Sequence, residues 1–154
     1  MHSQDKKPVQ SVTGILIKDA KVLLARHTYG VGKGKLIVPG GYVENGETPQ
    51  EALIREYKEE TGIIVEPENI IGIRFNMRDW YVAFKAKYIS GTAESDHHEN
   101  NEVVWMAVED ALKHDDVPDL TKKLIKSAIS DNEGLERIDY QSNNHPPFSF
   151  YGLK

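Results

Sequence analysis

Three glutamates stand at a spacing that could create a metal site. Glu56, Glu59 and Glu60 occupy positions i, i+3 and i+4 of one segment, and residues three and four apart share one face of an α-helix. Carboxylate oxygens are ligands that Mg²⁺ and Mn²⁺ favour in proteins. The spacing therefore predicts a helix with one acidic face that binds a divalent cation.

Two further residues are placed to hold this acidic face together. Arg55 reaches Glu59 across one helical turn, and Glu47, in the loop before the helix, can brace Arg55 from the other side. The competing interpretation is an ordinary solvated helix face, with Gly40-Gly41 as an ordinary turn. The presence of all these parts in one short window favours a site.

The window from Gly41 to Ile63 resembles the Nudix box, Gly-x5-Glu-x7-Arg-Glu-U-x-Glu-Glu-x-Gly-U, in which U is aliphatic. The matching positions are Gly41, Glu47, Arg55, Glu56, Glu59, Glu60, Gly62 and Ile63. Tyr57 departs from the pattern, since an aliphatic residue is usual there, and we interpret it as a packing variation on the apolar face of the helix. The resemblance, MutT-like in its organisation, extends over about residues 11–130.

This resemblance implies a fold, a reaction and a cofactor. The fold is α+β, a Nudix-type α/β/α sandwich with a mixed β-sheet between helices. The reaction is hydrolysis of the phosphoanhydride of a nucleoside diphosphate linked to another moiety, as in a nucleoside triphosphate or a nucleotide sugar such as ADP-ribose. The cofactor is Mg²⁺ (or Mn²⁺).

The resemblance also implies roles for the box residues. Glu47 and Arg55 are implied as an orienting pair. The implied metal ligands are Glu56, Glu59, Glu60 and a backbone oxygen at Gly40 or Gly41. Two other functions stay open: a catalytically silent Nudix-like domain that binds a nucleotide and regulates another activity, and an acidic domain that buffers metal or binds protein. Silent relatives generally lose box glutamates, whereas this chain keeps them, so an enzyme is favoured.

A base that accepts a proton from the attacking water could come from the helix or from a later loop. Glu99 and Glu102 lie in or just after the acidic loop 90–101. Glu99 is preferred, because a loop residue can swing toward metals held by the helix, and its removal is expected to lower kcat with little change in metal affinity. The alternative is a solvated acidic loop. His97-His98 are not predicted to bind metal, because adjacent side chains on an extended chain point apart.

Residues that recognise the substrate are less sharply encoded. A basic, glycine-containing loop at 27–35 and the turn near 78–79 carry cationic and aromatic side chains that could hold phosphate or stack on a base. The predicted substrate-binding residues are Arg26, Tyr29, Lys35, Arg74 and Arg78. The alternatives are solvated charges in the loop and a core position for Trp80, which begins an apolar strand face.

The helix that carries the acidic face has clear boundaries. Thr48 and Glu51 have the spacing of a capping box, and Pro49 suits the first helical position. Gly62 is suited to the residue just after the helix. The pattern therefore predicts a helix from Thr48 to about Thr61.

Local patterns place this helix among strands. Strands are expected at 12–17, 21–26, 36–38, 70–77, 80–89 and 103–106, with a hairpin connection at 18–21, a helical turn at 109–112 and a second long helix at 118–129. This order predicts a mixed sheet covered by helices.

Length and composition exclude several classes of protein. With 154 residues one domain is expected: a flexible N-terminus at 1–10, a hydrolase domain at 11–133 and a C-terminal tail at 134–154 packed on it. The absence of cysteine excludes disulfides and thiolate metal sites and fits a reducing compartment.

Charge and hydropathy narrow the partners. The net charge of −5 disfavours nucleic acid, which is gripped by basic surfaces, but it allows a small nucleotide whose charge is neutralised by metal. No apolar run is long enough for a membrane span, and a cytoplasmic location is expected. A homodimer is possible for such a domain, although no interface can be predicted.

Overall fold

The computed structural model describes residues 7–30, 32–143 and 148–153. Its first two strands, β1 (Val9–Lys18) and β2 (Lys21–His27), form an antiparallel hairpin. Asp19 and Ala20 in the turn have φ of 53° and 62°. Two consecutive residues with positive φ are typical of the two-residue hairpin turn whose twist matches that of the flanking strands. The expected hairpin is therefore confirmed.

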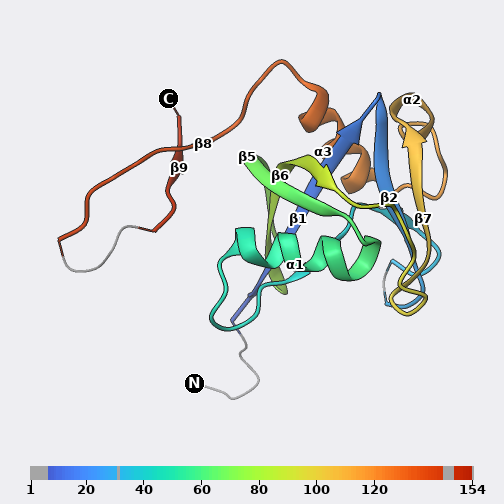
Figure 1. Ribbon diagram of the computed structural model, residues 1–154, viewed down its shortest axis with the longest axis horizontal. Helices are drawn as coiled ribbons and strands as arrows, with labels where there is room; N and C mark the ends of the chain where they lie inside the picture. Colours follow the sequence, from blue (N-terminus) through green and yellow to red (C-terminus); the bar gives the residue numbers. More distant parts are fainter. Residues whose placement is uncertain (1–6, 31, 144–147, 154) are drawn as a thin grey trace.

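Strand β1 organises the mixed sheet because it pairs with three other strands. Its first half pairs antiparallel with β4 (Gly40–Tyr42), and its end pairs with β2. Along its other edge it runs parallel to β6 (Asp79–Ser90), which pairs antiparallel with β5 (Ile64–Phe75). Strand β2 also pairs antiparallel with β3 (Leu36–Ile37) and β7 (Asn100–Ala107). Figure 1 shows these strands as one twisted sheet.

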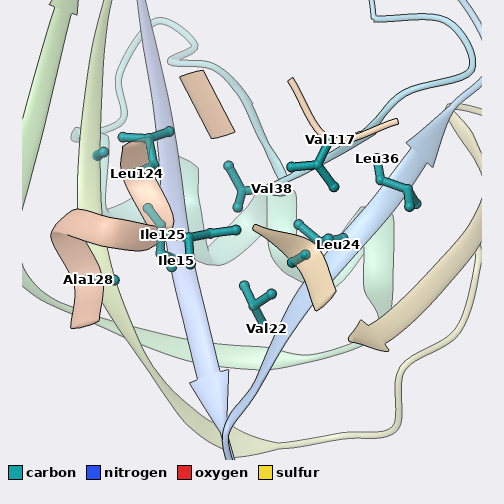
Figure 2. Packing of buried hydrophobic residues seen from close by; sticks show 11 residues of the cluster. Ile15, Val22, Leu24, Leu36, Val38, Val117, Leu124, Ile125 and Ala128 are labelled. Atoms are coloured by element: carbon teal, nitrogen blue, oxygen red, sulfur yellow. The ribbon is translucent and has the colours of Figure 1, made fainter. Parts of the chain in front are cut away.

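Helices cover both faces of this sheet. Helix α1 (Pro49–Thr61) contributes Ala52, Leu53 and Tyr57 to one buried cluster with Val12 of β1 and Phe84 of β6. The opposite cluster includes residues from α2 (Val108–Ala111) and α3 (Asp119–Ile129). Figure 2 shows Leu124, Ile125 and Ala128 of α3 packed in this second cluster. The expected α+β sandwich with a mixed sheet is confirmed.

Local interactions explain where α1 begins and ends. The Thr48 hydroxyl accepts a hydrogen bond from the N–H of Glu51, whose carboxylate accepts one from the N–H of Thr48. At the other end, Gly62 has a φ of 76° and donates its N–H to the carbonyl of Lys58. A residue other than glycine is strained in this left-handed conformation. The expected helix is thus confirmed with its caps.

Tyr57 is buried against the sheet on the apolar side of α1, as the sequence predicts. Its hydroxyl donates a hydrogen bond of 2.5 Å to the carbonyl of Gly14 in β1. A buried hydroxyl needs such a partner. The departure from the box pattern therefore adds a polar tie between helix and sheet.

One expectation and one alternative about the second hairpin need correction. Strand β5 begins at Ile64, six residues before the expected start at Ile70, and its pairing with β6 shifts register between Pro67 and Ile70. Proline is tolerated at such irregularities, which explains why the polar segment 66–69 does not end the strand. Trp80 is not a core residue, since it is 55% exposed at the start of β6.

Residues near both ends of the chain belong to strands. Val9 and Gln10 belong to β1, so the flexible segment expected at 1–10 is too long, while residues 1–6 lie outside the described residues. In the tail, β8 (Glu136–Arg137) pairs with β9 (Tyr151–Gly152), the strands labelled beside the C-terminus in Figure 1. Tyr151 contacts the ring of Phe84 edge-on, and the Gln50 amide of α1 donates hydrogen bonds to the hydroxyls of Ser149 and Tyr151. Across the described ranges, we find no helix with the length and apolarity to cross a membrane.

Candidate metal centre

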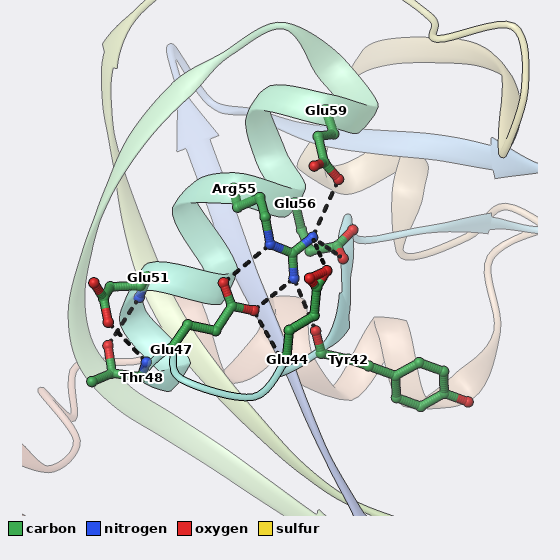
Figure 3. A network of polar contacts seen from close by, with 8 residues as sticks. All are labelled: Tyr42, Glu44, Glu47, Thr48, Glu51, Arg55, Glu56 and Glu59. Atoms are coloured by element: carbon green, nitrogen blue, oxygen red, sulfur yellow. Dashed lines mark hydrogen bonds and ion pairs between the residues drawn. The ribbon is translucent and has the colours of Figure 1, made fainter.

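The guanidinium of Arg55 organises the acidic side of α1. Its Nε and Nη2 donate to the two oxygens of Glu47 at 3.1 and 2.7 Å, and its Nη1 donates to Glu56 at 2.9 Å and to Glu59 at 3.2 Å. A further bond from Nη2 reaches the carbonyl of Tyr42 in β4 at 3.1 Å. Figure 3 shows this network between the helix, the preceding loop and β4. The predicted contact of Arg55 with Glu47 and Glu59 is therefore present.

Ion pairing with Arg55 has a clear electrostatic effect on Glu47. The hydrogen bonds from the guanidinium lower the pKa of the Glu47 carboxyl below its usual range. Glu47 also accepts a hydrogen bond of 2.8 Å from the N–H of Glu44. Glu47 is thus held as a carboxylate that fixes Arg55.

Three carboxylates meet next to this network. Single oxygens of Glu56, Glu60 and Glu99 all lie within 4.8 Å of one another. Glu60 is 2% exposed, and Glu56 and Glu99 are half-buried. The cluster therefore combines two helix residues with one residue from the distant loop before β7.

Two glycines allow β4 to pass close to these side chains. A Cβ at Gly41 would lie 2.6 Å from the carboxyl carbon of Glu56, and a Cβ at Gly40 would lie 2.2 Å from the carbonyl oxygen of Val12. The N–H of Gly40 donates to Glu60 at 3.0 Å. Any side chain at Gly41 would fill the space beside the cluster.

Burial changes the protonation of the cluster. Burial, reinforced by the charge of Glu56, raises the pKa of Glu60 to about 9. Burial also raises the pKa of Glu56, although the neighbouring Arg55 opposes this shift. Glu60 thus carries a proton at neutral pH when no cation is bound, because two close carboxylates in a buried site repel each other.

The donor set fits a hard divalent cation. The group offers three carboxylate oxygens, of the kind that Mg²⁺ and Mn²⁺ take. Burial raises the pKa values of Glu60 and Glu56, so their negative charges are poorly compensated without a cation. A cation placed there would compensate for the repulsion that otherwise keeps a proton on Glu60.

Binding of Mg²⁺ or Mn²⁺ is expected to release close to one proton per cation between about pH 6 and pH 8. The pKa of Glu60 lies at about 9 without metal, and a ligand carboxylate must be deprotonated. Affinity should therefore rise with pH through this interval. Calorimetric titration in buffers of different ionisation enthalpy measures the released proton. A proton count near zero at pH 7 would contradict the assignment of Glu60 as a ligand.

Other predicted acidic and histidine residues lie apart from the cluster of three carboxylates. Glu59 is outside this group, is 59% exposed at its side chain and contacts Arg55. Glu102 is not a member of the cluster. Its carboxylate instead accepts a hydrogen bond of 2.9 Å from Arg26. His97 and His98 are exposed, and neither belongs to a group of metal-ligating side chains in the part of the chain that the structure describes.

The backbone of Glu99 is hydrogen-bonded on both sides. Its N–H donates to Asp96 and its carbonyl accepts from the N–H of Thr28. These bonds fix the main chain of the loop, and the side chain extends from it to Glu56 and Glu60. The next residue, Asn100, is buried. The sequence does not indicate its role, because only the fold brings it to the end of α1.

The five predicted substrate-binding residues do not form one group. The guanidinium of Arg26 donates hydrogen bonds to Glu102, Asp116 and the carbonyl of Gly34. The remaining four comprise two exposed cations, Lys35 and Arg78, together with Arg74 and Tyr29.

Arg74 and Tyr29 have different surroundings. Arg74 forms an ion pair with Asp79, and its guanidinium lies 5.1 Å from the ring centre of Tyr81. Tyr29 is 56% exposed. Its ring stacks on that of His27. Partial burial and the charges of Glu99, Glu60 and Glu56 raise the pKa of its hydroxyl, so Tyr29 lies within electrostatic reach of the cluster of three carboxylates.

Comparison with known proteins identifies the family. A model of the NUDIX domain matches residues 7–127. An ADP-ribose pyrophosphatase of Methanocaldococcus jannaschii is 46% identical over 66 residues, which make up 43% of this chain and 39% of that protein. This chain thus spans about two fifths of the length of that archaeal relative.

Two further relatives cover more of the chain. A CTP pyrophosphohydrolase of Escherichia coli is 30% identical over 117 residues, or 70% of this chain and 82% of that protein. A NUDIX hydrolase structure from Nitrosomonas europaea has the same fold, with a TM-score of 0.70 at 24% identity over 79% of this chain and 69% of that one. With the box residues gathered around Arg55 and this domain match, the chain belongs to the Nudix hydrolase family.

Proposed function

We propose that the protein is a metal-dependent Nudix pyrophosphohydrolase that cleaves the phosphoanhydride of a nucleoside diphosphate linked to another moiety. The observation that carries this proposal is the meeting of Glu56, Glu60 and Glu99 beside the Arg55 network. A silent relative without its box glutamates could not assemble this group. The names of the two curated relatives support a nucleoside triphosphate or a nucleotide sugar such as ADP-ribose as substrate. A cytoplasmic location is part of the same proposal.

The residues of the chain have distinct roles in this proposal. Glu56, Glu60 and Glu99 hold Mg²⁺ or Mn²⁺, and Arg55 with Glu47 fixes the rotamer of Glu56. When bound, the cation supplies positive charge to the diphosphate and acidifies the attacking water. Glu99, the member of the group that lies outside the helix, is assigned as the acceptor of the proton of that water.

Glu59 stays a candidate ligand for a further cation. Its bond with Arg55, at 3.2 Å, is the longest hydrogen bond that the guanidinium makes, and its side chain is exposed. Rotation toward a cation therefore breaks one weak contact. The backbone oxygens of Gly40 and Gly41 are further candidate ligands, because Gly41 lies next to the carboxylate of Glu56.

Tyr29 is the predicted substrate residue that the geometry supports best. Its ring is exposed and its hydroxyl feels the charges of the three carboxylates, so a flat base or ribose of the substrate could contact it. Arg26 has a structural role in this proposal, because its guanidinium is already bound by two carboxylates.

A screen of purified protein tests the proposed function. Nucleoside triphosphates, nucleotide sugars including ADP-ribose, dinucleoside polyphosphates and capped RNA ends are incubated with Mg²⁺ or Mn²⁺, and products are separated by chromatography. Release of a mononucleotide is expected, with none from Glu60→Gln. Binding of nucleotide without turnover would indicate a silent domain, and neither binding nor turnover would indicate a metal-buffering or interaction domain. Light scattering on the same sample determines whether the protein is a dimer.

Glu99→Gln is expected to lower kcat by about 10²- to 10⁴-fold, the usual contribution of a general base. The position of Glu99 within 4.8 Å of Glu56 and Glu60 changes the earlier expectation for metal binding, and affinity for Mn²⁺ should now fall as well. The matched control is Glu102→Gln, three residues further on and bonded to Arg26. Steady-state kinetics and Mn²⁺ titration measure both effects. Normal kcat in Glu99→Gln with loss in Glu102→Gln would reverse the assignment.

A further inference from the structure

Glu99 reaches the helix carboxylates from a loop that needs a restraint. It lies in the segment between β6 and β7, yet its carboxylate stands within 4.8 Å of those of Glu56 and Glu60. Deprotonated carboxylates at this distance repel each other, and as metal ligands all three must lose their protons. The guanidinium of Arg55 is bound by Glu47, Glu56, Glu59 and the carbonyl of Tyr42. Hydrogen bonds within the loop and from its neighbours can hold Glu99 in place when the protons are lost.

Asn100 ties this loop to the end of α1. It is 1% exposed, and its side-chain Nδ2 donates a hydrogen bond of 2.9 Å to the backbone carbonyl of Glu60. That carbonyl belongs to the last turn of α1, where carbonyls have no partner within the helix. Asn100 thus supplies a hydrogen-bond donor to a free carbonyl at the end of α1. Because that carbonyl belongs to Glu60, the bond also brings the neighbouring Glu99 close to Glu60.

Asp96 fixes the chain on the other side of Glu99. One oxygen, Oδ1, accepts hydrogen bonds from the N–H groups of His98, Glu99 and Asn100 at 2.8, 3.0 and 3.1 Å. A carboxylate that binds three consecutive N–H groups defines the path of the backbone. The backbone of Glu99 is therefore held at the residue itself and at both neighbours.

Two hydroxyls complete the restraint. Ser95 Oγ donates to the carbonyl of Asn100 at 3.0 Å and accepts from the N–H of His97 at 3.0 Å. Thr28, just after β2, donates its N–H to the carbonyl of Glu99 at 3.1 Å and its hydroxyl to that of His98 at 2.8 Å. The loop is thus attached to α1, to the end of β2 and to itself.

We propose that Asp96 and Asn100 are positioning residues that hold Glu99 against Glu56 and Glu60, and that they thereby set the metal affinity of the site. This inference rests on the proposed function. It assigns no chemistry to either residue, because Asp96 uses its Oδ1 for backbone N–H groups and Asn100 is buried. Their contribution is the geometry of a ligand carried by a loop.

Asp96→Ala tests the proposal, and Asp96→Asn is its conservative partner. Alanine removes the acceptor of three hydrogen bonds, whereas the amide oxygen of asparagine can keep all three. Binding of Mn²⁺ without nucleotide, followed by electron paramagnetic resonance, is expected to weaken about 10- to 100-fold in Asp96→Ala, as for other residues that orient metal ligands. Asp96→Asn should keep most of the affinity. Asp131→Ala, at an exposed aspartate after α3, serves as the control with unchanged affinity.

Comparison with Glu99→Gln separates positioning from a general structural role. Once Glu99 is replaced, Asp96→Ala should weaken Mn²⁺ binding no further, because it acts only through Glu99. Hydrogen exchange should be faster at the amides of residues 98–100 in Asp96→Ala, while the protection of α1 is kept. Additive losses in the double variant, or an affinity in Asp96→Ala equal to that of the unaltered protein, would overturn the proposal.

Asn100→Ala provides a second, independent variant. If Asn100→Ala folds, it should show the same loss of Mn²⁺ affinity as Asp96→Ala. If Asn100→Ala does not fold, the test rests on Asp96→Ala alone. Failure of the proposed function gives a different pattern: the unaltered protein would then bind Mn²⁺ or nucleotide without turnover, or bind neither. An unaltered protein that binds Mn²⁺ and turns over, with Asp96→Ala indistinguishable from it, contradicts the positioning role alone.

Discussion

Glu60→Gln is expected to abolish most turnover while leaving the metal-free protein as stable as before or more stable. Loss of a direct metal ligand should lower kcat by at least about 10²-fold. Mutation of a residue that only orients a ligand lowers activity by up to about that factor. Glutamine resembles the protonated Glu60 that burial favours at neutral pH, and its amide oxygen can still accept the N–H of Gly40. Kinetics and thermal denaturation without metal measure these two effects, and Mn²⁺ titration tests for the loss of the ligand.

The pH dependence of stability provides an internal check on Glu60→Gln. Burial raises the pKa of Glu60 from 4.5 to about 9 in the folded protein, so its contribution is fully present below the unfolded pKa and is lost as pH rises through the folded pKa. The metal-free protein should therefore lose stability between about pH 4.5 and pH 9, and the variant should lose less. Glu68→Gln, at an exposed glutamate of β5, should behave like the unaltered protein. Near-normal turnover in Glu60→Gln would exclude Glu60 as a ligand.

Arg55→Lys is expected to lower kcat by about 10- to 100-fold while raising KM much less. The guanidinium donates to Glu47, Glu56 and Glu59 and to the carbonyl of Tyr42 at once. A lysine ammonium keeps the charge but not the planar fork that holds two oxygens of one carboxylate. Glu56 should then lose its fixed orientation, which affects the transition state more than the binding of substrate.

Steady-state kinetics of Arg55→Lys at saturating Mg²⁺ provide the measurement, and Arg137→Lys on the exposed strand β8 is the matched control. A rise in KM alone would show that Arg55 binds substrate directly. A normal kcat would show that Glu56 keeps its orientation through packing.

The sequence predicts the helix with the acidic face better than any other element. Its capping residues, Thr48 and Glu51, act through local hydrogen bonds, and Gly62 ends it through its own conformation. These signals depend on neighbours within a few positions, so the chain alone reveals them. The same holds for Arg55 and Glu59, one turn apart.

Long-range partners explain what the sequence does not reveal. Arg26 pairs with Glu102 and Asp116, which lie 76 and 90 positions further on, and nothing near Arg26 indicates this. Asn100 contacts Glu60 across 40 positions. Trp80 follows the strand's alternation, which left a core position open as an alternative, but at the start of β6 the side chain is exposed.

The gathering of Glu56, Glu60 and Glu99 from separate segments has a consequence for the order of folding. Helix α1 and the β1–β2 hairpin consist of local contacts and can form early, whereas Glu99 joins them only when β7 has paired with β2. A chain in which β7 has not yet paired lacks the complete set of three carboxylates. Under the proposed function, Mg²⁺ would therefore stabilise the folded domain alone, by about 2.7 kcal/mol at a concentration 100 times the dissociation constant.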